Sequence, residues 1–154
     1  MRWWRRRREP ASPSYPDDGS LPVVGGSDDP ARADSAVVAE IAAGGVDLSV
    51  PVLVRHHLRL PDELAVEETR RMLGADGYAV VAAPESGAPG GSIGGAPGAS
   101  PAAWAVRASR TQLLVPLSVA QERSRMAGLA QRLGGEAQSW DVCAPVGPAR
   151  PVDG

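Results

Sequence analysis

Two adjacent histidines, His56 and His57, are the first candidates for chemistry, because imidazole can transfer protons or bind a metal near neutral pH. They lie in the stretch 52–60, whose alternating residues predict a β-strand. Neighbouring side chains on a strand point to opposite faces, so the two imidazoles cannot ligate one metal. We interpret His56 as a partly buried histidine with a hydrogen-bond partner and His57 as a surface residue. The alternative is a pH-sensitive contact.

The remaining nucleophiles and acids form no catalytic constellation. Cys143, the single cysteine, is expected to be a half-buried apolar filler just past the last strand, without a positioned base. Glu63, Glu67 and Glu68 fall on the solvated face of an expected helix. All 16 basic residues are arginine, which excludes a Schiff-base or phosphate-loop lysine. The sequence therefore predicts a protein that is not an enzyme and uses no metal or cofactor.

Charge is unevenly distributed along the first third of the chain. Residues 1–8 contain five arginines, and residues 9–48 contain eight acidic residues against Arg32. Residues 1–33 are rich in Pro, Ser, Gly and Asp without a hydrophobic period, so we expect a disordered tail. Its arginine cap is either solvated or contacts RNA phosphates or an anionic membrane surface. The residues for such a contact are Trp3, Trp4, Arg5, Arg6, Arg7 and Arg8.

Hydrophobic periodicity and turn residues predict the elements that position these side chains. In the first half of the chain we expect a short helix over 35–43 capped by Asp34 or Ser35, a strand over 52–60, a helix from Pro61 to near Gly77 and a strand over 78–83. A Gly-rich loop over 84–101 follows. In the second half we expect a strand over 103–109, a helix over 118–133 capped by Ser118, a strand over 137–142 and a Pro-rich tail over 145–154. Strand, helix, strand, strand, helix, strand is the order of a split βαβ sandwich. The prediction is an α+β, ferredoxin-like fold with a four-stranded antiparallel sheet and two helices on one face. Strands 52–60 and 103–109 should be central neighbours.

The side chains on the open face of that sheet form the most plausible binding surface. Alternation turns Leu53, Arg55, His57 and Arg59 away from the core, beside Ala105, Arg107 and Ser109. One interpretation is a solvated outer face. The functional one is a docking site for an acidic protein segment, because guanidinium groups pair with carboxylates. Direct RNA contact ranks second, since this face lacks stacking aromatics. Trp140 is expected to be a core or edge anchor, with a partner contact as the alternative.

Three stretches together resemble the regulator of ribonuclease activity B (RraB) family. They are VAEIAAGGVDLSVPVLVRHHLRLP at 38–61, LGADGYAVV at 73–81 and LAQRLGGEAQSWD at 129–141. The resemblance implies a domain over 34–144 and a non-enzymatic protein that binds a ribonuclease E-type endoribonuclease and restrains its cleavage. The alternative is an RNA- or membrane-surface-binding protein that acts through the arginine cap. With no apolar run of membrane-spanning length and no recognisable signal peptide, the sequence indicates a cytoplasmic protein.

Overall fold

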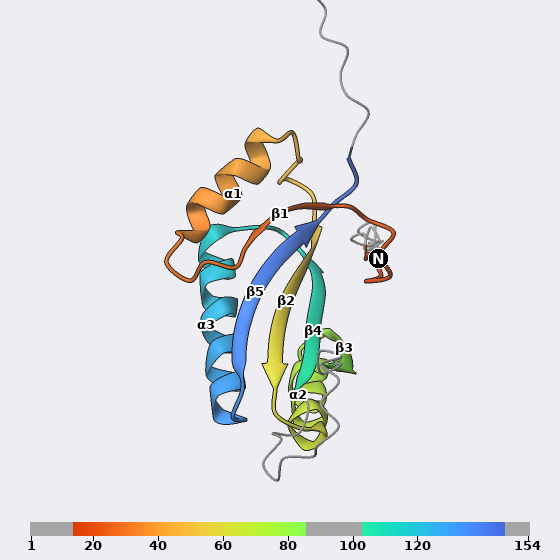
Figure 1. Cartoon of the computed structure of the whole chain (residues 1–154). Helices are drawn as coiled ribbons and strands as arrows, with labels where there is room; N and C mark the ends of the chain where they lie inside the picture. The colour runs from red at the N-terminus through yellow and green to blue at the C-terminus, as the bar shows by residue number, and fades with distance from the viewer. Residues whose placement is uncertain (1–13, 86–102, 147–154) are drawn as a thin grey trace, which may run out of the picture.

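The computed structural model describes residues 14–85 and 103–146, which form a five-stranded antiparallel sheet and three helices (Figure 1). The elements are β1 (Val23–Ser27), α1 (Asp34–Ala43), β2 (Val52–Leu60), α2 (Glu63–Ala75), β3 (Ala79–Pro84), β4 (Trp104–Gln112), α3 (Pro116–Arg132) and β5 (Glu136–Cys143). The strand order across the sheet is β1-β5-β2-β4-β3. Every neighbouring pair in this sheet is antiparallel.

Strand β2 lies at the centre of the sheet and separates its two faces. Its neighbours are β4 and β5, so the expected pairing of strands 52–60 and 103–109 is confirmed. Val54, His56 and Leu58 are buried on one face, while Arg55 and His57 on the other are only partly buried. The alternation read from the sequence therefore gives the correct sidedness of β2.

The core lies between one face of the sheet and the three helices, in two clusters. At the end nearer α2, Leu58 of β2 packs with Leu73 and Met126 from the helices. At the other end, Ile41 of α1 packs with Trp140 of β5. Because Trp140 is only 2% exposed, it is the core anchor that the sequence predicts, and it is not available for a partner contact.

Helix starts differ from the sequence prediction. Helix α2 begins at Glu63, and its N-cap is Asp62, whose carboxylate accepts a 2.8 Å hydrogen bond from the Ala65 amide. Helix α3 begins at Pro116, two residues before the predicted cap Ser118, because proline at the first helical position needs no hydrogen-bond partner for its nitrogen. Helix α1 is preceded by Ala33 and has no side-chain cap, so both predicted caps for it are wrong.

The predicted number of strands is also wrong, because β1 lies within the stretch expected to be a disordered tail. It pairs with β5, from Val23 opposite Cys143 to Ser27 opposite Trp140. Gly26 permits this approach: a Cβ there would lie 2.4 Å from the Trp140 carbonyl oxygen. With β1 and α1 included, the sheet has five strands and three helices pack on it, rather than four and two. Residues 14–33 thus belong to the folded unit.

Several predicted segments fall outside the described residues. These are the arginine cap over 1–8, nearly all of the Gly-rich loop over 84–101, and the C-terminal tail from residue 147 onward. Within the described ranges, none of the helices has both the length and the apolar character to cross a membrane.

Candidate functional site

The outer face of the sheet, opposite the helices, carries Arg55, His57, Arg59 and Arg107, which we call the arginine face. His57 and Arg107 occupy directly opposed positions on β2 and β4, and Arg55 lies two positions from His57 along β2. Arg59 lies further along the same strand, where its Nε donates a 3.0 Å hydrogen bond to Glu85. The structure thus brings Arg55, His57 and Arg107 together and places Arg59 at the margin.

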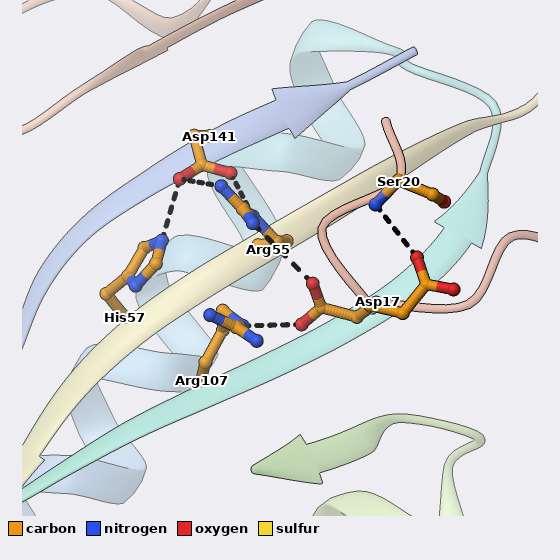
Figure 2. Close-up of polar contacts among 7 residues, drawn as sticks. Asp17, Ser20, Arg55, His57, Arg107 and Asp141 are labelled. Carbon is orange, nitrogen blue, oxygen red and sulfur yellow. Dashed lines mark hydrogen bonds and ion pairs between the residues drawn. The ribbon is translucent and has the colours of Figure 1, made fainter. Parts of the chain in front are cut away.

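An acidic segment of the chain itself lies across this face. Residues 14–20, which we call the strap, have no regular secondary structure and run past the ends of β2 and β4 (Figure 2). Pro16 favours an extended conformation at Tyr15. After Asp17 the chain turns: the Asp18 carboxylate accepts a 2.9 Å bond from the Ser20 amide, and Gly19 takes a φ of 80°. The turn redirects the chain towards β1.

Asp17 forms the central contact between the strap and the arginine face. Its Oδ2 accepts a hydrogen bond from Arg107 Nε, and its Oδ1 lies 3.5 Å from a terminal nitrogen of Arg55 (Figure 2). The Asp17 side chain is only 3% exposed, so its carboxylate is enclosed between two guanidinium groups. A buried carboxylate is tolerated only with such charged partners.

Asp141 of β5 provides a second carboxylate on the same face. Arg55 donates to it twice, from Nε at 2.5 Å and from a terminal nitrogen at 3.0 Å, which is the bidentate geometry of a strong pair. His57 Nε2 lies 2.7 Å from Asp141 Oδ2. Burial raises the pKa of Asp141, but hydrogen bonds from His57 and Arg55 outweigh burial and hold it below its usual range. The side chain of His57 is therefore paired rather than free at the surface.

Sequence reasoning identified the cations of this site but missed both acids. Asp141 could have been found, because the alternation of the last strand puts it on the face opposite Trp140 and next to β2. Asp17 carried no local signal, since the strap has no hydrophobic period and lies 90 residues from Arg107. The predicted contact residue Trp140 lies on the other face, in the core.

His56 belongs to a separate polar network on the helix side of the sheet. The Glu122 carboxylate of α3 lies 3.1 Å from His56 Nε2 and accepts bonds from Arg110 at 2.9 Å and Gln112 at 2.8 Å. Arg110 also stacks over the Tyr78 ring, 4.4 Å from its centre. His56 is buried and has a polar partner, as the sequence interpretation expected, although it is more deeply buried than expected.

One further cleft and one thiol in the described part of the chain are the other candidates for chemistry. A cleft of about 390 Å³ separates α3 from the start of β5, but its charged residues Asp34 and Arg123 pair with each other. Cys143 lies inside β5 rather than beyond it, and burial raises the pKa of its thiol, which disfavours the nucleophilic thiolate. In residues 14–85 and 103–146, no three His, Cys, Asp or Glu side chains are grouped to hold a metal.

The charge of the described residues also argues against phosphate binding by the folded unit. It contains ten arginines and sixteen acidic residues. Of these ten arginines, nine lie within 4 Å of a carboxylate oxygen. Binding to nucleic acid depends on cations that are free to replace counterions. The folded unit therefore suits a protein partner better than RNA.

Comparison with known proteins agrees with the residue-level resemblance. A family model described as RraB, Regulator of ribonuclease activity B, matches residues 31–142. No curated protein and no solved structure matches the chain. The matched span begins after β1, so the strap and β1 both precede it.

Proposed function

The chain belongs to the regulator of ribonuclease activity B family, and from this membership we propose that it is a non-catalytic, cytoplasmic regulator that binds a ribonuclease E-type endoribonuclease and restrains its RNA cleavage. The family match over residues 31–142 carries this proposal, because it covers the folded unit from α1 to β5. Restraint requires no chemistry from the regulator. Contact that limits RNA access to the ribonuclease is sufficient.

The arginine face is the proposed contact surface for the ribonuclease. Guanidinium groups recognise carboxylates in a fixed, forked geometry, and Asp17 already occupies the position that a partner carboxylate would take. Arg55, His57 and Arg107 would form the centre of the contact and Arg59 its margin. Trp140 is no longer part of this site, because it is buried on the opposite face.

The second candidate function is binding of RNA or an anionic membrane surface by Trp3, Trp4 and the arginine cap. It rests on the sequence alone, since these residues precede the described part of the chain. Phosphate-driven binding should fall steeply as salt increases and should disappear when residues 1–8 are deleted. Protein docking through the arginine face should survive that deletion.

The proposed function can be tested with purified components. The full-length chain is titrated into a ribonuclease E-type endoribonuclease cleaving a short fluorescent RNA, and the initial cleavage rate is measured. We expect the rate to fall in a saturable manner. Arg107→Glu should raise the concentration needed for half-inhibition, because it places a negative charge against the partner's carboxylates. Arg71→Glu is the matched control, since Arg71 is an exposed arginine on α2 that is likewise paired with a carboxylate, that of Glu68.

Two results would contradict the proposal. An unchanged cleavage rate at saturating protein, with no complex detected by analytical ultracentrifugation, would rule out the regulator function. Equal inhibition by the wild type, Arg107→Glu and Arg71→Glu would keep the function and reject the arginine face as the contact surface.

A further inference from the structure

The strap lies outside the span matched by the family model and occupies the proposed contact surface. Residues 14–20 precede the span matched by the family model, which begins at residue 31. They nevertheless lie against β2 and β4, where Leu53 and Ser109 are buried although both point away from the helices. The surface proposed for the partner is therefore closed by the chain's own acidic segment.

The strap fits this surface only partly. A cavity of about 360 Å³ remains between Tyr15 and Asp17 of the strap and Leu53 and Thr111 of the sheet. Asp17 Oδ1 is buried without a hydrogen bond, since the nearest Arg55 nitrogen is 3.5 Å away. The contact between the strap and the sheet is therefore incompletely packed at this point.

The polar contacts that hold the strap are few and specific. Besides the two arginines on Asp17, the Tyr15 amide donates a 2.8 Å hydrogen bond to Thr111 Oγ1. Together they describe how an extended peptide would be recognised: one backbone bond to the end of β4, and a carboxylate two residues later between Arg55 and Arg107. These are the elements of a peptide-binding site.

We propose that Arg55, Arg107 and Thr111 form a binding site for an extended acidic segment of the partner protein, and that the strap is a tethered competitor that occupies this site in the free protein. The identity of the partner rests on the proposed function, whereas the site itself does not. Because the strap is tethered, its effective concentration at the site is high, on the order of millimolar for a short flexible connection. The partner must displace it, so the apparent affinity is lowered by the fraction of molecules in which the site is closed.

The site can be tested without the ribonuclease, using the strap as a peptide in trans. A fluorescein-labelled peptide, SYPDDGSLP, corresponds to residues 14–22. Its binding to full-length protein is measured by fluorescence anisotropy. Asp17→Asn should bind it about tenfold or more tightly than the wild type, since the competitor loses its charge. Asp18→Asn is the matched control, because Asp18 is exposed and bonds only within the turn. It should bind the peptide as weakly as the wild type does.

A second variant opens the site without changing either charge. Tyr15→Pro removes the backbone amide through which the strap donates to Thr111 Oγ1, whereas Thr111 and the peptide's own Tyr amide are kept, so this variant should also increase peptide binding, by less than Asp17→Asn. This variant keeps the test valid if Asp17→Asn does not fold. A peptide with Asn in place of its first Asp should fail to bind the opened protein.

Substituting each partner of the Asp17–Arg107 ion pair distinguishes a docking site from a purely structural contact, because a docking site predicts opposite effects on peptide binding. Asp17→Asn and Arg107→Glu break the same contact, so a structural role predicts that neither variant gains peptide binding. A docking site predicts that Asp17→Asn gains binding and that adding Arg107→Glu to it abolishes the gain. No gain in Asp17→Asn or Tyr15→Pro, with amide exchange showing the strap released, would overturn the proposal.

The same variants distinguish this inference from the proposed function. Peptide binding by Asp17→Asn without any effect of the protein on ribonuclease cleavage would support the site and refute the regulator function. Conversely, inhibition of cleavage without peptide binding to the opened variants would support the regulator function and refute the tethered competitor.

Discussion

The buried carboxylate of Glu122 is expected to be one of the larger electrostatic contributions to stability. It receives three contacts, from His56 Nε2, Arg110 and Gln112, and its side chain is 12% exposed. Glu122→Gln preserves the shape but removes the charge, and its amide has one acceptor oxygen where the carboxylate has two. The substitution therefore removes the ion pair with Arg110 and weakens the remaining hydrogen bonds, because their acceptor is no longer charged.

The size of the effect follows from these contacts. A hydrogen bond to a charged group contributes about 1.5–3 kcal/mol, and Arg110 can recover part of its loss because it reaches solvent. We expect Glu122→Gln to lower the free energy of unfolding by about 2–3 kcal/mol at neutral pH. Glu67→Gln is the control, since Glu67 and Arg70 form an exposed pair on α2 and its loss should leave the denaturation midpoint unchanged.

The effect should also depend on pH in a definite direction. Burial raises the pKa of Glu122, but hydrogen bonds from His56 and Gln112 and the positive charge of Arg110 lower it below its ordinary value of 4.5. A depressed pKa means that the folded protein binds the proton more weakly than the unfolded chain. The stability that Glu122 contributes is therefore complete above about pH 4.5 and disappears as the pH falls through the folded-state pKa.

Urea denaturation followed by circular dichroism, at a series of pH values from about 7 to 3, measures both effects. The gap in midpoint between the wild type and Glu122→Gln should narrow as the pH falls. A gap that stays constant over this range would show that lost packing, rather than the carboxylate charge, causes the destabilisation. If Glu122→Gln is as stable as Glu67→Gln at pH 7, the reasoning is refuted.

Three further substitutions test other parts of the structure. Gly135→Ala should lower the free energy of unfolding, measured by urea denaturation, by about 1–3 kcal/mol, because its Cβ would lie 2.0 Å from the Arg59 carbonyl oxygen. The control Gly128→Ala adds its Cβ to open space on α3, so it should leave the stability unchanged or increase it. Trp140→Ala should lower the free energy of unfolding by about 3–5 kcal/mol in the same measurement, since the indole packs in the core against α1. Asp141→Asn should lower the melting temperature at pH 7 and lower it less at pH 3, because the contacts that depress the pKa of Asp141 stabilise the folded protein only while its carboxylate is ionised. An equal loss at both pH values would contradict that explanation.

Local patterns in the sequence predicted the parts of the fold that depend on local side-chain spacing. The alternation of 52–60 gave the sidedness of β2, and the residues of the arginine face followed from it. Helix starts were less predictable, because a backbone can begin a helix at Pro116 without any side-chain cap. Strand β1 was missed because Gly25 and Gly26 are typical of turns, and only close packing on Ile41 and Trp140 explains them.

The candidate site shows more clearly that local patterns do not predict contacts between distant segments. The cations lie on central strands, where periodicity fixes their direction, so they could be predicted. Their partners could not, because the contact between Asp17 and Arg107 joins residues 90 positions apart through a segment without secondary structure. Charge composition alone favoured an acidic ligand for this face, but it could not show that the chain supplies one.

The position of β1 has a consequence for the order in which the protein folds during synthesis. The central strand β2 needs β4 and β5 as neighbours, and both follow it in the chain. Among the described strands, β1 pairs with β5 alone, and β5 is the last of them in the chain. Such distant pairings are slow to form, because a long loop must close before any contact stabilises it. Strand β1 can therefore join the sheet only after β5 has been made, although it precedes the other described strands in the chain.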